Sequence, residues 1–285
     1  MTARTCVACG GASWSPLWTQ LQRCGACGFV TARELPDAAA IERLYGAAYF
    51  AGEEYAYYLG DRAVHEANFR RRFARITAVA GPLASLYEIG CAYGFWLATA
   101  AAHGVRAAGI DVSADAVRHA RDVLRLDAAC GAFEDAPLEP GAWQAFCMWD
   151  TLEHLAHPQA HVARVASLLP RGGWFFATTG DIGAPLARRQ GERWRMIHPP
   201  THLQYFSRDT IARFLARHGL ELVHVESVPM RRSLHGTLVG LERFGHCAGR
   251  TLARAASALL PGAFTRRAGF TVDLGDIMLA CARKP

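Results

Sequence analysis

Four cysteines near the N-terminus are the residues with the clearest potential for chemistry. They form two Cys-x-x-Cys pairs, Cys6 with Cys9 and Cys24 with Cys27, and a glycine follows each pair. Two such pairs supply four thiolates from two turns, which suits tetrahedral coordination of Zn²⁺. We predict a structural zinc site in a small ribbon, because four thiolates leave no open position for a substrate or water.

Disulfides and a redox Cys-x-x-Cys motif are the alternatives for these cysteines. We expect a cytoplasmic protein, because the N-terminus does not resemble a secretory signal, and that setting disfavours disulfides. The segment is too small for a core of its own, so we expect metal ligation to supply its folding energy, on the order of 10 kcal/mol. Four other cysteines lie in strand-like or core-like contexts and are expected to pack as small apolar side chains: Cys91, Cys130, Cys147 and Cys281.

A second group of residues has the spacing of a nucleotide site. Small residues, with Gly90 and Gly94 among them, separate an apolar run ending near Glu88 from a helical pattern. Without bulky side chains, backbone amides can approach a ligand at the helix N-terminus. Asp111 ends the next apolar run roughly 20 residues further on, where an acid accepts hydrogen bonds from ribose hydroxyls.

The elements that position these residues alternate along the chain. From residue 85 onward, strand-like runs and helical patterns follow one another, which indicates βαβ units and a largely parallel sheet. Ser207 is the expected cap of one helix and Gly219 its closing residue. Residues 181–206 lack periodicity and are predicted to be a long loop with substrate contacts. The expected strands are 86–90, 106–111, 128–132, 145–149, 174–179, 221–228 and 276–282, and the expected helices are 95–103, 115–124, 159–168 and 208–218.

Length and composition favour a globular protein in three parts. Of 285 residues, 51% are hydrophobic and 20% are charged, which is ordinary for such proteins. The net charge of +6 weakly favours an anionic partner, but the arginines are scattered. No apolar run is long enough to cross a bilayer. We expect a zinc ribbon at 1–36, a helical linker at 37–80 and a main domain at 81–285 with a helical insertion at about 231–267.

Three segments together resemble the class I methyltransferases that use S-adenosylmethionine (SAM). They are Glu-Ile-Gly-Cys-Ala-Tyr-Gly from Glu88, Gly-Ile-Asp ending at Asp111, and Asp-Thr-Leu-Glu-His-Leu from Asp150. The third segment is the most telling, since it is uncommon in dehydrogenases. The ribbon is similar to that of a bacterial subgroup associated with sugars and secondary metabolites. The resemblance implies a Rossmann-like α/β fold with a seven-stranded, mostly parallel sheet and a final antiparallel strand, plus the ribbon.

The resemblance also implies a SAM site. Glu88 would bind the methionine amino group, Asp111 the ribose, and Asp150 would lie beside the methionine moiety. Ala92 replaces the usual middle glycine, and Ala132 stands where many members have an acid for the adenine amine. We therefore expect stacking and backbone contacts to hold adenine. The expected cofactor-binding residues are Tyr49, Glu88, Gly90, Ala92, Gly94, Asp111, Val112, Phe133, Glu134 and Asp150.

Histidines that follow two expected strands are the candidates for acid–base chemistry. Methyl transfer is an in-line attack on a sulfonium carbon, and a hydroxyl nucleophile must also lose a proton. A histidine suits that task. His154 and His202 are the expected catalytic residues, with a loop-anchoring role as the alternative for each.

These features predict an enzyme that transfers a methyl group from SAM to a small molecule, with oxygen of a sugar or secondary metabolite as the favoured acceptor. Carbon or nitrogen methylation and a homodimer stay open. A zinc-ribbon RNA (guanine) methyltransferase is the main alternative, although the ribbon holds few basic residues, Arg23 and Arg33 among them. A SAM-binding protein without catalysis, or a ribbon that docks a partner, is a second. A nicotinamide-dependent dehydrogenase would need a fuller glycine fingerprint.

Overall fold

A seven-stranded sheet forms the centre of the molecule. The computed structural model describes residues 4–37, 40, 58–244 and 247–285, and the sheet has the order β10-β13-β8-β7-β4-β5-β6. Neighbouring strands pair in parallel except β13, which is antiparallel to both β8 and β10. The predicted fold is thus confirmed, with strand ends shifted by a residue or two. The strands are β4 (Ser85–Ile89), β5 (Arg106–Asp111), β6 (Asp127–Cys130), β7 (Ala145–Trp149), β8 (Trp174–Gly180), β10 (Glu221–Ser227) and β13 (Ile277–Arg283).

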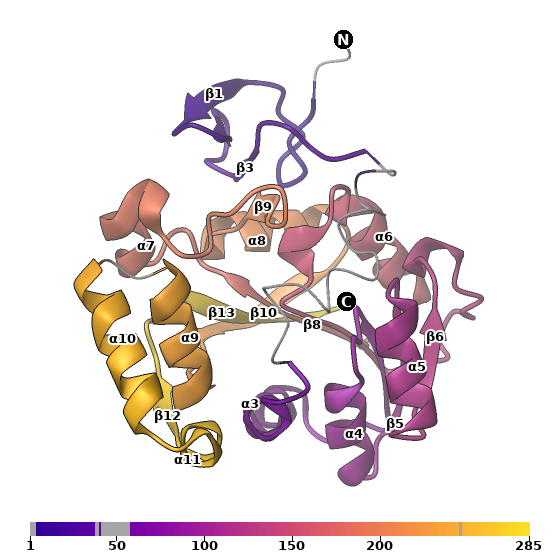
Figure 1. Cartoon of the computed structure of the whole chain (residues 1–285). Coiled ribbons are helices and arrows are strands. Elements are labelled where there is room, and N and C mark those ends of the chain that lie inside the picture. The colour runs from indigo at the N-terminus through magenta and orange to yellow at the C-terminus, as the bar shows by residue number, and fades with distance from the viewer. Residues whose placement is uncertain (1–3, 38–39, 41–57, 245–246) are drawn as a thin grey trace.

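Helices cover both faces of the sheet (Figure 1). One face carries α3 (Arg62–Ala80), α4 (Phe95–Ala102) and α5 (Ala114–Asp122), and the other carries α6 (Pro158–Leu168) and α8 (Arg208–Arg217). The central strands are buried along their whole length because helices shield both faces, and such strands are continuous apolar runs in sequence. The layers therefore leave the carboxyl ends of the strands as the edge where a ligand can bind.

The loop predicted at 181–206 contains regular structure. Helix α7 (Pro185–Gln190), the 3₁₀ turn η3 (Gly191–Arg193) and strand β9 (Gln204–Tyr205) lie within it. The prediction of a long loop missed these elements, and β9 could not be foreseen because it forms only by pairing with a strand of the N-terminal ribbon, far away in sequence.

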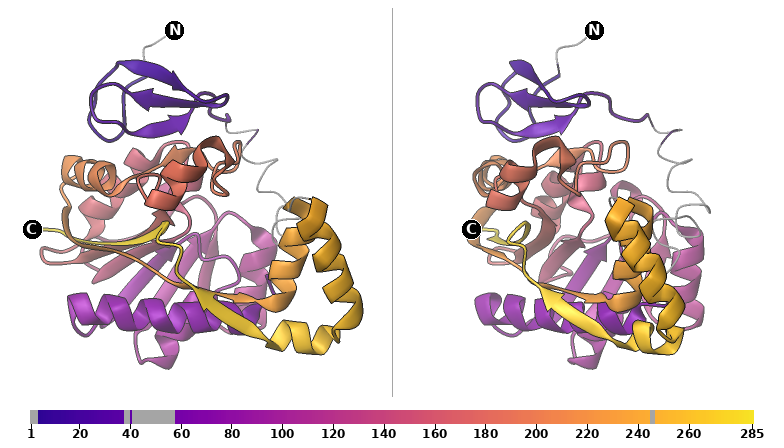
Figure 2. Two further views of the ribbon diagram at one scale, coloured as in Figure 1. Left: turned by 90° about the vertical axis from the view of Figure 1, so that its left-hand side faces the viewer. Right: turned by 60° about the vertical axis from the view of Figure 1, so that its left-hand side comes forward.

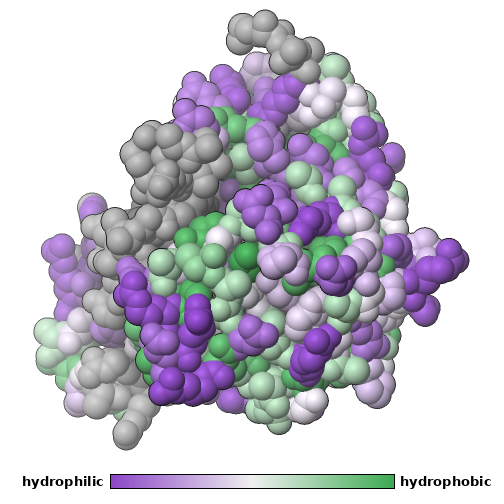
Figure 3. Space-filling model, turned by 90° about the vertical axis from the view of Figure 1, so that its right-hand side faces the viewer, coloured by the Kyte–Doolittle hydropathy of each residue, from purple (hydrophilic) through white to green (hydrophobic). Residues whose placement is uncertain are grey.

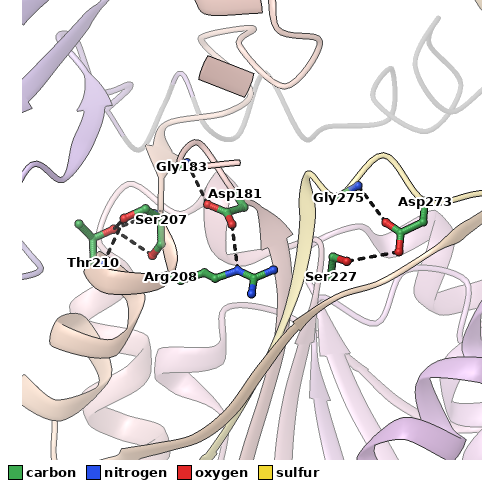
Figure 4. A network of polar contacts seen from close by, with 8 residues as sticks. All are labelled: Asp181, Gly183, Ser207, Arg208, Thr210, Ser227, Asp273 and Gly275. Atoms are coloured by element: carbon green, nitrogen blue, oxygen red, sulfur yellow. Dashed lines mark hydrogen bonds and ion pairs between the residues drawn. The ribbon is translucent and has the colours of Figure 1, made fainter. Parts of the chain in front are cut away.

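Polar contacts anchor both ends of this segment (Figure 4). At its start, the Asp181 carboxylate accepts hydrogen bonds from the Gly183 amide, at 2.9 Å, and from Arg208 Nε, at 3.2 Å. At its end, Ser207 and Thr210 form a reciprocal capping box, which confirms Ser207 as the cap of α8. The segment is thereby held against the first turn of α8.

The N-terminal ribbon lies over the α8 side of the molecule (Figures 1 and 2). Strands β1 (Trp14–Leu17), β2 (Leu21–Cys24) and β3 (Val30–Ala32) form an antiparallel sheet, which β9 extends. The Phe29 ring packs on Phe206 of the main domain, with centroids 5.0 Å apart. We expected metal ligation alone to supply the folding energy of the ribbon. The ribbon also docks on the main domain, a contribution to its stability that the sequence did not reveal.

The helical insertion projects from one end of the sheet (Figure 2). Helices α9 (Leu234–Phe244), α10 (Cys247–Leu259) and α11 (Gly262–Arg267) form it, as expected. Two strands that we did not predict, β11 (Met230–Ser233) and β12 (Gly269–Val272), pair antiparallel at its base. Their pairing joins the two ends of the insertion, so its helices leave and rejoin the domain at one place.

The expected burial of four cysteines outside the ribbon can be compared with the structure. Cys91, Cys147 and Cys281 are buried as expected, but Cys130 is exposed, because β6 is an edge strand of the sheet.

Tyr49, expected to contact the cofactor, lies outside the described residues. Among the described residues, no helix is both long and apolar enough to span a membrane. The face shown in Figure 3 mixes hydrophilic residues with small hydrophobic patches.

Candidate active site

The turn between β4 and α4 has the backbone shape of a ligand cradle. Gly90, Ala92 and Gly94 all have left-handed φ angles, of 80°, 44° and 78°. A Cβ atom on Gly90 would lie 2.6 Å from Thr151 Oγ1, and one on Gly94 would lie 2.8 Å from a Leu126 methyl carbon. The two glycines are therefore required both by conformation and by space.

Asp111 holds this turn in place from the end of β5. One carboxylate oxygen accepts a hydrogen bond of 2.8 Å from the Ala92 amide, and the other accepts one of 2.9 Å from the Ser113 amide. A left-handed alanine costs about 1–2 kcal/mol, and the Asp111 hydrogen bond helps to offset that cost. Each oxygen keeps a lone pair with which ribose hydroxyls could interact.

Glu88 is the buried acid of the site. Its side chain is 2% exposed, and its Oε2 atom has no hydrogen-bond partner. Burial, with a smaller contribution from Asp111, raises the pKa of Glu88 well above its usual value. A buried carboxylate oxygen without a partner is costly, and a ligand ammonium group would supply the missing donor. The site therefore fits the amino group of SAM.

Asp150 and Arg72 form an ion pair beside this acid. Arg72 Nη2 of α3 donates to Asp150 Oδ2 at 2.7 Å, and Thr178 Oγ1 donates to Asp150 Oδ1 at 2.9 Å. Burial would raise the pKa of Asp150, but Arg72 lowers it below its usual value. Asp150 has a left-handed φ of 51°, which this network stabilises. Sequence reasoning missed Arg72, since its only signal was an arginine among the aromatic residues of α3.

The residues expected around adenine differ in exposure. Val112 is 55% exposed, whereas the Phe133 ring is 3% exposed and packs against Phe146 and His161. Glu134 lies 3.2 Å from His161 Nδ1. The Phe133 ring thus belongs to the core, which leaves its backbone and the Val112 side chain as the surfaces available for a base.

The two expected catalytic histidines lie together on the other side of Asp150. The ring centroids of His154 and His202 are 4.6 Å apart, edge to face, and the His198 ring lies tilted against His202 with centroids 3.7 Å apart. Burial lowers the pKa of His154 to about 4 and that of His202 to about 2. Burial, together with Asp150, raises the pKa of the adjacent Glu153 to about 8. Both imidazoles are therefore neutral at neutral pH.

The ribbon and the β7–α6 segment clamp the chain next to His202. The Leu203 amide donates to the carbonyl of Glu153, and the Leu203 carbonyl accepts from the Ala32 amide of the ribbon, both at 2.8 Å. Gln204 Nε2 donates to the Leu155 carbonyl at 2.9 Å. The ribbon therefore supports the histidine cluster, a connection that the sequence did not indicate.

The four N-terminal cysteines converge as the sequence predicted. Their sulfur atoms all lie within 4.8 Å of one another, with Cys6 and Cys27 at 3.7 Å and Cys9 and Cys24 at 3.6 Å. The Gly11 amide points to Cys9 Sγ at 3.4 Å. This compact tetrad of thiols, with a backbone donor, fits a tetrahedral metal ion.

Comparisons with known proteins agree with this geometry. Residues 61–225 match the family model described as "Methyltransferase domain". The chain is 29% identical over 154 residues to "Ubiquinone biosynthesis O-methyltransferase" of Burkholderia pseudomallei, covering 50% of this chain and 66% of that protein. The protein of the same name in Chromobacterium violaceum is 30% identical over 126 residues, which are 41% of this chain and 53% of that protein.

Solved structures show the same fold. A putative methyltransferase from Bacillus halodurans has a TM-score of 0.54 and 14% identity, covering 74% of this chain and 98% of that one. A SAM-dependent methyltransferase, possibly a histamine N-methyltransferase, from Thermotoga maritima also has a TM-score of 0.54, with 15% identity over 83% of this chain and 97% of that one. The chain therefore belongs to the methyltransferase domain family and is a class I SAM-dependent methyltransferase.

Proposed function

We propose that this enzyme methylates a hydroxyl oxygen of a small molecule, with a sugar or secondary metabolite as the acceptor class. The observation that carries the proposal is the cradle at Gly90–Gly94 beside the unpartnered carboxylate oxygen of Glu88. The names of the O-methyltransferase relatives support oxygen as the acceptor atom. The chain spans only 66% and 53% of the lengths of those two relatives, so their names alone do not identify the acceptor of this enzyme.

In this proposal the SAM site is built from the residues around the cradle. Glu88 accepts from the ammonium group, Asp111 from the ribose hydroxyls, and Asp150 borders the methionine moiety. Val112 and the backbone of Phe133 face the adenine. SAM, when bound, supplies an electrophilic methyl carbon. Gly90, Ala92 and Gly94 line the cradle, Glu134 flanks the adenine side, and Tyr49 stays an expectation outside the described residues.

The acceptor occupies the histidine side of Asp150. As the new carbon–oxygen bond forms and the carbon–sulfur bond breaks, the acceptor hydroxyl must lose its proton. We propose that His154 or His202, whose rings are neutral at neutral pH, accepts this proton. The burial of His202 also keeps water away from that side of the site.

We also propose that the cysteine tetrad binds one structural Zn²⁺. The four sulfur atoms are close enough to share an ion, and four protein ligands leave no position for chemistry. The metal would stabilise the ribbon and, through β3, the chain that carries His202. Its role is therefore separate from that of SAM.

RNA as the acceptor receives little support from the ribbon. Arg33 donates to the carbonyls of Leu21 and Trp18, and Arg4 donates to the carbonyl of Ala32. These arginines stabilise the ribbon itself, whereas RNA binding requires a concentrated basic patch. The observation favours a small acceptor.

Mass spectrometry of the native protein, followed by calorimetry, tests the proposal. We expect zinc and either SAM or its demethylated product in purified protein, and heat on adding SAM to ligand-stripped, zinc-replete protein. A screen of phenols, sugars and secondary metabolites should then yield an O-methylated product. If neither SAM nor its demethylated product gave any heat of binding, the proposed cofactor site would be contradicted. Salt-sensitive turnover that RNA stimulates would instead identify RNA as the acceptor.

A further inference from the structure

The histidine cluster has the composition of a second metal site. Glu153 and His154 lie in the turn η2 (Leu152–His154) after β7, and His202 lies just before β9. One ligand atom from each of these three side chains lies within 4.8 Å of the others. Within the described part of the chain, this group and the cysteine tetrad are the two that meet such a criterion.

The outer contacts of the two histidines are those of metal ligands. His154 Nδ1 lies 2.9 Å from the Thr201 carbonyl oxygen, and His202 Nδ1 lies 2.8 Å from the Met196 carbonyl oxygen. A carbonyl oxygen only accepts, so each Nδ1 carries the hydrogen and each Nε2 carries the lone pair. Metal-binding histidines are oriented in this way, by donating the other ring N–H to a carbonyl or carboxylate.

Glu153 supplies an independent observation. Glu153 is 2% exposed, and neither of its carboxylate oxygens makes a hydrogen bond of normal geometry in the described structure, with the Thr179 hydroxyl as the neighbouring donor. Burying a carboxyl group without partners is expensive, whereas a bound cation would satisfy it. The backbone of Glu153 is fixed by the Leu203 amide, at 2.8 Å, so the acid and His202 are held side by side.

From this geometry we propose that Glu153, His154 and His202 bind one divalent transition-metal ion of the Zn²⁺ class. A donor set of two imidazoles and one carboxylate suits such ions better than Mg²⁺ or Ca²⁺, which prefer oxygen ligands alone. Three protein ligands leave a fourth position for an external ligand, unlike the cysteine tetrad. His154 is only partly buried, which provides a way in for the ion.

The proposal extends the role of these histidines without depending on the acceptor. With an ion bound, the Nε2 lone pairs are occupied, so the two imidazoles hold the metal instead of taking the acceptor proton themselves. An oxygen of the acceptor could fill the fourth position, where a Lewis acid would lower the pKa of its hydroxyl so that the proton passes to water. The existence of the site can be tested with the metal alone.

Metal analysis of the full-length protein supplies the main test. After saturation with Zn²⁺ and removal of free ion, wild-type protein should retain one equivalent more than the Glu153→Gln and His202→Ala variants. Titration with Zn²⁺ should show that each substitution lowers the affinity for this additional ion by at least about tenfold. His224→Ala is the matched control, because His224 lies on β10 outside the cluster and should leave the metal content unchanged.

Cobalt distinguishes the two sites. Co²⁺ in the cysteine tetrad gives intense thiolate-to-metal charge transfer, whereas Co²⁺ bound by nitrogen and oxygen gives only weaker d–d bands. We expect the second type of band in wild type and its loss in Glu153→Gln, with the charge-transfer band retained.

Circular dichroism and SAM calorimetry establish that each variant is folded, and His154→Ala replaces any variant that is not. Uptake by wild type of only the cysteine-bound equivalent, or uptake by the cluster variants equal to that of wild type, would overturn the proposal. Failure of methyl transfer with the second ion present would instead contradict the proposed function.

Discussion

The two sides of Asp150 are built in different ways. On the cofactor side, Gly90, Ala92 and Gly94 follow one another along the chain, and Asp111 is bonded to their backbone. On the histidine side, His154 and His202 come from segments that are joined through Leu203 and supported by the ribbon. The first side is one local βαβ unit, whereas the second is an assembly of three separate parts of the chain.

This difference predicts how each side responds to change. The cofactor side depends on backbone shape and on single hydrogen bonds, so its variants should have local effects on SAM affinity or stability. The histidine side depends on long-range pairing, so a change in the ribbon should reach it. Four predictions test the comparison, beginning with the largest expected effect.

Removal of the ribbon metal should have the largest effect. Cys24→Ser, or strong chelation, should cost the ribbon most of the stabilisation that the proposed zinc ion would provide, on the order of 10 kcal/mol. Hydrogen exchange should then rise in β1–β3 and, through lost pairing, in β9, while β4 and β5 stay protected. Cys130→Ser, at an exposed cysteine outside the tetrad, is the control. Unchanged protection of β9 in ribbon-unfolded protein would show that the histidine side does not depend on the ribbon.

Loss of a clustered histidine should separate turnover from cofactor binding. His202→Ala should lower turnover by about two orders of magnitude with SAM affinity preserved, because the ring acts only on the acceptor side. Steady-state kinetics and calorimetry with SAM measure the two quantities. His224→Ala should change neither. Full activity of the His202 variant with a known acceptor would remove this residue from the mechanism.

Loss of the buried acid Glu88 should weaken cofactor binding. Glu88→Gln keeps the shape of the side chain but removes its charge, so SAM affinity should fall by about ten- to a hundredfold, the value of a charge-assisted hydrogen bond. Calorimetry measures the loss of affinity, and the midpoint temperature of thermal unfolding of the SAM-free protein should not decrease. Asp115→Asn, at an exposed acid of α5, is the control. Unaltered affinity would mean that Glu88 does not meet the ammonium group.

The smallest effect should come from the left-handed alanine. Ala92→Gly removes the strain of a φ of 44° and should stabilise the protein by about 1 kcal/mol. Ala98→Gly, inside α4, should instead destabilise it by about 1 kcal/mol, because glycine is a poor helix former. Denaturant unfolding measures both changes. Destabilisation by both substitutions would argue that Ala92 contributes packing that outweighs its strain.

Much of the cofactor side could be predicted because its residues are neighbours in sequence. Glycines in the β4–α4 turn and an acid at the end of β5 are enough to indicate the cradle from the amino-acid sequence. Arg72 escaped prediction, since an arginine on a helix is usually exposed and nothing local indicates that it reaches Asp150. The burial of the Phe133 ring also escaped prediction, because it depends on contacts with Phe146 and with His161 of α6.

The amino-acid sequence by itself determined the alternation of strands and helices and the cradle, because periodicity and close spacing are properties of neighbouring residues. The resemblance of three short segments indicated the class I methyltransferase family. Tertiary structure alone decided that β9 completes the ribbon sheet, that Arg72 neutralises Asp150, and that Glu153, His154 and His202 converge. Hydrogen bonds and ion pairs between segments that are far apart in sequence form only when the tertiary fold brings those segments together. No local sequence pattern indicates which distant segments will meet.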